Sequence, residues 1–319
     1  AQQSKLRKIS LNRLEQAIEE NNGVVTSDMK FLAGMLRLKY VFFYPESGDI
    51  VIAGPAEGWM EMPDGNTVGI STGRPTLQLE DLVVALRAFP ADGQPTREIG
   101  CSIDPTEEGL ANMRQFMRSV SHIQPYQDRA FAAGIRNSLG MQEISVDGIS
   151  PNTHFARVMI EADYRMKLIG IGLERPPVKM VSFIDAVTPA AAASNALFRW
   201  YFVPDYESVR VSQDGLGMEL VGDGVKLVGE DEVVSADGTR TGTGRILPAS
   251  KRFTDSFTQK YPELARRSPV YAQLRNLIDM AVAAAWIQES GLYDRAEWKM
   301  EFLGNEKKYP VETLTAPVK

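Results

Sequence analysis

The amino-acid sequence predicts an α+β fold, with a mixed α/β N-terminal part that includes a central helix, then an antiparallel β region followed by C-terminal helices. Helical and strand-like apolar patterns alternate between residues 79 and 169, which is typical of chains that mix both element types. After residue 176 the patterns shorten, and Asp-Gly pairs at 214–215, 223–224 and 237–238 indicate tight hairpin turns. Helical spacing returns from residue 251 onward.

The chain length predicts more than one structural unit. Its 319 residues exceed the size at which a single hydrophobic core stops growing. We therefore expect a mixed α/β domain over residues 1–175, and a second domain over residues 176–319 that holds the β-hairpins, the C-terminal helices and an extended tail.

Capping and turn residues give the individual elements their expected bounds. Helices are predicted over residues 6–21, 27–36, 79–89, 104–120, 126–139, 150–169, 251–261 and 268–291. Strands are predicted over residues 38–44, 50–53, 59–60, 68–70, 98–103, 141–146, 198–203, 208–211, 216–220 and 225–227. Residues 235–245 are expected to form a loop, and the tail from Leu303 is expected to extend over the surface or onto a neighbouring chain.

The central helix has the most regular pattern. Pro151 suits the first position of a helix, so Ser150 is expected to be the N-cap. At about 100° per residue, six apolar side chains share one face, which we expect to be buried. They are Phe155, Val158, Met159, Ala162, Met166 and Ile169.

Ionisable side chains follow one edge of this helix. His154, Glu161 and Arg165 lie along that edge, with Arg157 a little further round. These four residues form our candidate ligand-binding set, because clustered charges mark binding sites in some proteins. The alternative is a solvated face, because Glu161 and Arg165 form an acid-before-base pair four residues apart that needs no ligand. The sequence leaves both interpretations open.

No motif identifies a catalytic centre. Cys101 lies just before a predicted helix N-terminus, which lowers a thiol pKa, and a nucleophile there would need His154 or His122 as its partner. Lone cysteines are more often buried and unreactive. The catalytic residues are therefore unknown. The candidates are Cys101, His154 and Asp104, and the alternative is that Cys101 is a buried, unreactive residue.

The sequence also lacks the patterns that bind metals and cofactors. Two histidines more than thirty residues apart, without carboxylates at ligand spacing, do not define a metal centre. The Asp-Gly pairs lack the spacing of a calcium loop, and neither a P-loop nor a Rossmann fingerprint is present. We expect no metal and no cofactor.

Composition and charge disfavour two classes of partner. Hydrophobic residues make up 44% of the chain and charged residues 24%, close to the averages of soluble globular proteins. The net charge of -6 is opposite to the basic surface that binds nucleic acids or anionic membranes. No apolar run reaches the ~18 residues of a transmembrane helix. We expect neither a nucleic-acid partner nor a transmembrane segment.

The first residues suggest export. Ala1, Gln2 and Gln3 resemble the start that signal-peptide cleavage leaves, which predicts a periplasmic, cell-surface or extracellular protein. A chain shortened for expression would start in the same way. Because Cys101 is the sole cysteine, no internal disulfide can form, and packing must supply the stability.

Several segments resemble a family of exported planctomycete proteins catalogued as a domain of unknown function. The resembling segments cover residues 6–11, 52–59, 72–75, 101–106 and 154–167. The resemblance extends over most of the chain and implies an exported protein. It implies no activity, cofactor or catalytic residue.

These observations favour an exported, non-catalytic structural protein that works by assembly. We expect a homo-oligomer, or a protein partner within an envelope or extracellular structure, because the strand edges and the tail suit docking. The alternative is an envelope hydrolase or a small-ligand-binding protein that uses the edge of His154, Arg157, Glu161 and Arg165.

Overall fold

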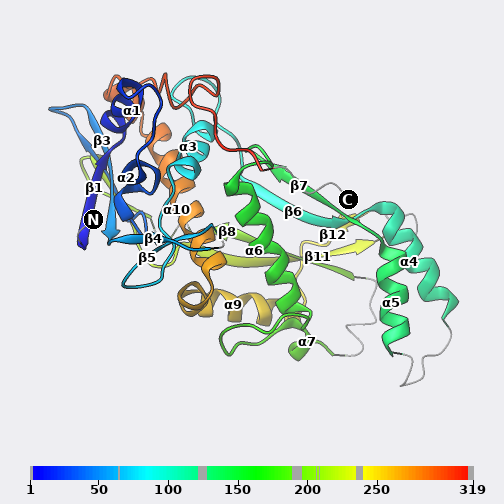
Figure 1. Ribbon diagram of the computed structural model, residues 1–319. Coiled ribbons are helices and arrows are strands. Elements are labelled where there is room, and N and C mark those ends of the chain that lie inside the picture. The colour runs from blue at the N-terminus through cyan, green and yellow to red at the C-terminus, as the bar shows by residue number, and fades with distance from the viewer. Residues whose placement is uncertain are drawn as a thin grey trace.

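The structure is a computed structural model, which describes residues 3–63, 65–120, 128–188, 196–205, 207, 209–234 and 240–314. Helices and antiparallel sheets occur together along the described chain, which confirms the predicted α+β class. Figure 1 shows a sheet at one end, a group of helices in the middle, and β-ribbons with a helical hairpin at the other end.

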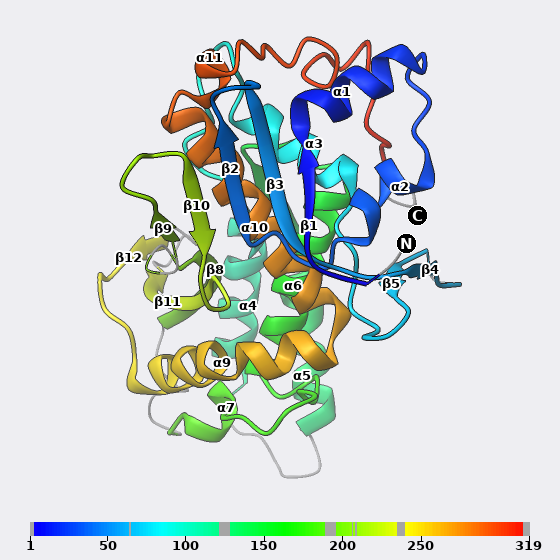
Figure 2. The same cartoon turned by 90° about the vertical axis from the view of Figure 1, so that its left-hand side faces the viewer.

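A five-stranded antiparallel sheet covers one side of the molecule (Figure 2). Its strands, in spatial order, are β1 (Ser4–Ser10), β3 (Asp49–Ala56), β2 (Tyr40–Tyr44), β10 (Gly217–Leu220) and β9 (Val209–Val211). Val41 lies opposite Ile52 on β3 and opposite Met218 on β10. Side chains alternate along β2, so Val41 and Phe43 are buried and their neighbours are partly exposed. The sheet thus joins strands from both halves of the sequence.

Residues 6–10 form a strand, so the helix predicted from residue 6 begins too early. β1 pairs with β3 up to Ser10, and Ser10 is then the N-cap of α1 (Leu11–Glu20). The helical spacing identifies the buried Leu11 and Ile18, but it cannot reveal that β3 offers hydrogen bonds to the preceding residues. The second predicted helix is divided into the short α2 (Ser27–Lys30) and the 3-10 turn η1 (Leu32–Gly34).

Four helices build the central core. They are α3 (Leu79–Ala88), α6 (His154–Gly170), α9 (Pro248–Arg267) and α10 (Pro269–Glu289). α10 contacts the other three helices. Ser268 and Pro269 occupy the N-cap and first position of α10 as expected. Beside them lie the short α7 (Phe183–Ala186) and α11 (Leu292–Arg295).

The central helix α6 confirms its predicted buried face but not its predicted start. All six apolar residues of that face are buried. The N-cap is Thr153, whose Oγ1 accepts a hydrogen bond from the backbone N–H of Ala156 and donates one to the carbonyl of Ser150. The Ser150 cap is therefore wrong, because residues 150–152 form a turn and the Thr153 hydroxyl serves the first helical turn.

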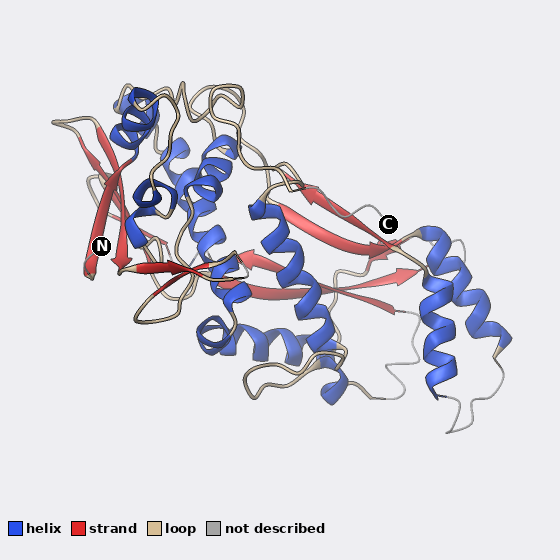
Figure 3. Ribbon diagram, viewed as in Figure 1, coloured by secondary structure: helices blue, strands red, loops and turns tan. Residues whose placement is uncertain are grey.

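Four elements extend to the far end of the molecule, and we call them the arm (Figure 3). They are β6 (Gly100–Pro105), α4 (Glu107–Ser119), α5 (Asp128–Leu139) and β7 (Gln142–Asp147). The predicted helix start at residue 104 is wrong, because α4 begins at Glu107. Asp104 and Pro105 are held extended by pairing with β7, and Thr106 caps α4 by accepting a hydrogen bond from the backbone N–H of Gly109 at 3.0 Å.

Two smaller antiparallel groups complete the fold. The first consists of β8 (Ala196–Pro204), β11 (Val225–Val234) and β12 (Arg240–Gly242), and the second of β4 (Trp59–Glu61) and β5 (Thr67–Gly69). The loop predicted over residues 235–245 is wrong for residues 240–242, which pair with β11. Residues 235–239 lie outside the described part of the chain.

The C-terminal segment packs on the chain's own body. Glu15 Oε1 accepts hydrogen bonds from the backbone N–H groups of Phe302 (2.8 Å) and Leu303 (2.7 Å), and its Oε2 accepts one from the indole of Trp298. The guanidinium of Arg87 donates to the carbonyl of Leu303 at 2.8 Å. The described tail thus runs over the surface of its own chain, which is one of the two arrangements expected from the sequence.

Within the described residues, no helix combines the length and apolar character that a membrane crossing needs.

Candidate functional site

The candidate site begins with a histidine–carboxylate pair. His154, the first residue of α6, places Nδ1 2.9 Å from Oδ2 and 3.0 Å from Oδ1 of Asp81 on α3. Asp81 is buried, and the imidazole is partly buried. The carboxylate fixes the ring through Nδ1, which leaves Nε2 as the nitrogen available to a ligand.

The charge state of His154 is set by two opposing effects. Burial lowers the pKa of the imidazole, but the hydrogen bond and negative charge of Asp81, with a further contribution from Glu80, raise it above its ordinary value overall. The positive charge of Arg157 acts in the lowering direction. The pair therefore favours an imidazolium held by a buried carboxylate, an arrangement that can donate to an anionic or polar ligand.

The other edge residues form a separate group. Arg165 lies 2.9 Å from Glu174 and 3.5 Å from Glu161, so two carboxylates already balance its charge. Arg165 lies eleven positions after His154, which is roughly 16 Å along a helix. Arg157 is exposed between these positions. The structure therefore divides the four predicted residues into the His154 end and the Arg165 pairings, and no single small ligand spans both.

Cys101 lies against the opposite flank of α6. On β6 it is close enough to α6 for the charges of Asp163 and Lys167 to act on its thiol, and the Lys167 ammonium donates to the carbonyl of Ile103 at 3.1 Å. Burial, reinforced by the negative charge of Asp163, raises the pKa of Cys101 to about 12. A nucleophilic cysteine needs a lowered pKa, so these surroundings disfavour the thiolate.

The remaining catalytic candidates do not assemble around the thiol. Asp104 accepts a hydrogen bond from Ser102 on its own strand. His154 is held by Asp81, and His122 lies outside the described residues. Among the described residues, no group of three or more His, Cys, Asp and Glu side chains is arranged to hold a metal ion.

A cavity of about 610 Å³ lies between α3, the turn before α6 and the C-terminal segment, and neither His154 nor Asp81 lines it. Val84 and Ala88 line it, one and two turns after Asp81 on α3, and Thr153 lines it just before His154. Val311 and Thr313 of the C-terminal segment close another side. The cavity is therefore bounded by three segments that are far apart in the sequence, and His154 directly follows the lining residue Thr153.

The sequence did not identify Asp81 and Glu174 as site residues. Asp81 holds the imidazole of His154, and Glu174 pairs with the guanidinium of Arg165. Asp81 lies in the first turn of an apolar helix, where an acidic residue is explained by the helix dipole alone. Its burial among apolar neighbours is visible only in the fold. The available signal was the pair of acidic residues Glu80 and Asp81 at the start of the mostly apolar helix of residues 79–89.

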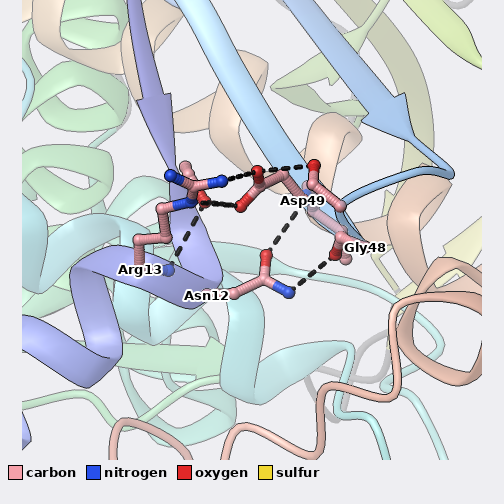
Figure 4. Close-up of polar contacts among 7 residues, drawn as sticks. Asn12, Arg13, Gly48 and Asp49 are labelled. Carbon is pink, nitrogen blue, oxygen red and sulfur yellow. Dashed lines mark hydrogen bonds and ion pairs between the residues drawn. The ribbon is translucent and has the colours of Figure 1, made fainter.

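A second polar network ties α1 to the turn between β2 and β3 (Figure 4). The guanidinium of Arg13 donates to both carboxylate oxygens of Asp49, at 2.9 Å and 2.6 Å. The hydroxyls of Ser10 and Ser47 also donate to Asp49, each at 2.7 Å. Asn12 accepts from the backbone N–H of Ile50 at 2.9 Å. Each of these side chains has a hydrogen-bond partner within the network, which indicates a structural role.

Asp49→Asn is expected to lower the free energy of unfolding by about 1–2 kcal/mol at neutral pH, because the Arg13 partner is largely exposed and solvent weakens the pair. The hydrogen bonds from Arg13 lower the pKa of Asp49 from 3.8 to about 2, against the effect of burial and with the help of Ser10 and Ser47. This stabilisation is complete above pH 3.8 and is lost as the pH falls towards 2.

Urea unfolding between pH 2 and 7 measures this effect. The matched control is Glu46→Gln, which changes an exposed acid in the same turn. This variant should lose stability at low pH as the wild type does. A variant lacking Asp49 that loses stability below pH 4 as steeply as the wild type would contradict the assignment.

One family model matches part of the chain. Residues 101–183 match the family described as Protein of unknown function (DUF1598). The matched range runs from β6 to α7 and so includes most of the arm and the whole of α6. No curated protein and no solved structure matched the chain.

Proposed function

We propose that this chain is an exported, non-catalytic structural protein that acts by assembly, as a subunit of an envelope or extracellular structure. The observation that carries the proposal is the arm, which extends from the body beyond α6 (Figure 1). A projecting element of this kind supports contact with a second molecule. Export is supported by the resemblance to exported planctomycete proteins, and cell fractionation of the native host tests it.

The arm is built from units that are weak by themselves. β6 and β7 pair with each other to form a two-stranded ribbon, and α4 packs on α5. Gly134 permits the close approach of the Phe116 ring, because a Cβ at that position would lie 2.2 Å from it. Isolated two-stranded ribbons are marginal in water, and helices of 12 to 13 residues depend on tertiary packing. Contact with a partner would stabilise both units.

The surface of the arm also supports docking. Met141 is 78% exposed and Ile144 is 53% exposed, and both lie at or beside β7. β7 pairs with β6 alone among the described strands, so its other edge offers backbone hydrogen-bonding groups. An extended segment of a partner can add to such an edge, with apolar side chains providing specificity.

Size-exclusion chromatography with light scattering on the purified full-length chain tests the proposal. We expect a concentration-dependent oligomer that Ile144→Glu weakens at least tenfold, because a charge replaces an exposed apolar side chain on the arm. Thermal stability should change little, since the side chain is half exposed in the single chain.

The matched control is Val211→Glu, which places the same charge on a residue that is 51% exposed on the edge strand β9. We expect this control to leave the oligomer intact. A wild type that stays strictly monomeric, or a Val211 variant that dissociates as readily as the Ile144 variant, would contradict assembly through the arm.

A second candidate function is small-ligand binding or envelope hydrolysis at the cavity beside His154. The specific observation is the buried Asp81 that holds the imidazole of His154, one residue after Thr153 in the wall of a cavity of about 610 Å³. A ligand that binds the folded chain raises its melting temperature. Unchanged melting temperatures across a panel of small anionic and polar ligands would exclude this candidate.

A further inference from the structure

The cavity between α3, the turn before α6 and the C-terminal segment receives apolar side chains from all three segments. Its volume of about 610 Å³ falls within the range of small-molecule sites. Val84 and Ala88 of α3 are buried in its wall. Ile149 of the turn and Val311 of the C-terminal segment also line it, and both pack against the hydrophobic core. This wall suits the apolar part of a small ligand.

The C-terminal segment is fixed on both sides of this cavity. Figure 1 shows the segment, in red, running from beside α3 towards the start of α6. The guanidinium of Arg87 on α3 donates to the carbonyls of Leu303, at 2.8 Å, and Tyr309. Further along, the backbone N–H of Leu314 donates to the carbonyl of Asn152 at 2.7 Å. Most residues between these two anchors line the cavity, so this part of its wall is held by hydrogen bonds.

Arg87 also supplies a positive group with a free bonding position. It lines the cavity, and its two hydrogen bonds, from Nε and Nη2, go to neutral carbonyl groups. Its third nitrogen, Nη1, has no acceptor among the described residues, and it is not among the buried polar atoms that lack a partner. Solvent therefore reaches Nη1, which leaves this nitrogen accessible to a ligand.

The charge of Arg87 lacks a partner in contact. Burial lowers the pKa of its guanidinium, and the negative charge of Glu306 opposes this as a smaller effect. Glu306 also lines the cavity, but it is exposed and forms no ion pair with Arg87. A partly buried cation that is bonded to neutral groups alone is stabilised by an added anion.

We propose that this cavity binds a small organic carboxylic acid, whose carboxylate accepts from Nη1 of Arg87 and whose apolar body lies against Val84 and Ala88. The single free nitrogen and the nearby negative charge of Glu306 favour one negative charge over the two of a phosphate. Binding of this acid rests on the second candidate function, ligand binding at this cavity, and does not depend on assembly through the arm. The carboxylate belongs either to a free acid or to the C-terminus of an apolar peptide.

Isothermal titration calorimetry on the full-length chain, in a buffer free of carboxylates, tests the proposal. Hexanoate represents the free acid, and N-acetylleucine represents a peptide C-terminus. Hexanamide keeps the apolar body without the charge, and acetate keeps the charge without the body. We expect saturable binding of hexanoate, of N-acetylleucine or of both, and at least tenfold weaker binding of hexanamide and of acetate.

The charges of the wall give a test that leaves the fold intact. Glu306→Gln removes an exposed negative charge beside the proposed carboxylate, so it should tighten hexanoate binding by about threefold. The same variant should leave hexanamide binding unchanged. Arg87→Met removes the donor and should abolish hexanoate binding; where that variant does not fold, the Glu306 variant provides the test.

The location of the site is tested by filling the cavity. Ile149→Trp should weaken hexanoate binding at least tenfold, because the larger side chain occupies the space of the ligand. The matched control is Ile171→Trp at a residue that is 45% exposed and does not line the cavity, and it should bind as the wild type does.

No saturable binding of either acid, or equal binding of hexanoate and hexanamide, would overturn the proposal. Weaker or unchanged hexanoate binding by the Glu306 variant, or unchanged binding by the Ile149 variant, would also overturn it. The second candidate function fails separately, when the broader panel of anionic and polar ligands leaves the melting temperature unchanged.

Discussion

Replacing Glu15 by alanine is expected to lower the free energy of unfolding by about 3–5 kcal/mol. The buried carboxylate accepts hydrogen bonds from the indole of Trp298 and from the backbone N–H groups of Phe302 and Leu303. Without it, three buried donors lose their acceptor, at about 1–3 kcal/mol for each unsatisfied group, partly offset by relaxation. The C-terminal segment would then separate from α1.

Urea unfolding measures this loss, and the same helix supplies the control. Glu19→Ala removes an exposed acid whose nearest cation, Lys308, is 4.0 Å away, and should cost less than about 0.5 kcal/mol. Glu15→Gln keeps one acceptor oxygen and should lie between the two. If the Glu15 and Glu19 alanine variants were equally stable, the carboxylate would not be the anchor of the segment.

The second large effect is expected at Asp279. Asp279→Asn should cost about 3–5 kcal/mol, because it removes the negative partner of the buried Arg37 and leaves an uncompensated charge. Asp279 is 1% exposed, so water cannot replace the lost partner without opening the structure. The variant should unfold at a lower urea concentration and with an unchanged dependence on urea.

Asp255→Asn makes the same chemical change in an exposed pair. Lys251 and Asp255 lie 2.7 Å apart, but both side chains are 61% exposed, so the expected cost is below about 0.5 kcal/mol. The double variant Arg37→Met/Asp279→Leu replaces both buried charges by apolar groups and should be more stable than Asp279→Asn alone. A single variant at Asp279 as stable as the Asp255 variant would show that the pair is not desolvated.

Local sequence rules correctly predicted the elements whose tertiary contacts favour the same local structure as their own residues do. The apolar face of α6 is buried as its spacing requires, and the hairpin of β2 and β3 follows its turn residues. The same rules failed where a distant segment competes. Ser10 ends a strand because β3 lies beside it, and Asp104 stays extended because β7 pairs with it.

The candidate site shows the same limit. The sequence identified His154 and the pair of Glu161 with Arg165, because both depend on one helix. It did not identify Asp81, which is 73 residues away and is buried against His154. Cys101 was a candidate nucleophile from its position before a predicted helix, yet burial of the thiol, with the negative charge of Asp163 as a smaller effect, raises its pKa to about 12.

The sequence by itself determined the α+β class, the buried faces of the helices and the turns of the β2–β3 and β9–β10 hairpins, because these depend on spacing within about ten residues. The hairpin predicted at residues 223–224 is wrong, because β10 and β11 on either side of it lie in different sheets. The tertiary structure decided which charges meet. Glu15 with Trp298 and Arg37 with Asp279 are each separated by more than 200 residues, so only the fold brings them together. Burial then determines their energies, since a charge removed from water depends on the particular partner that the fold places beside it.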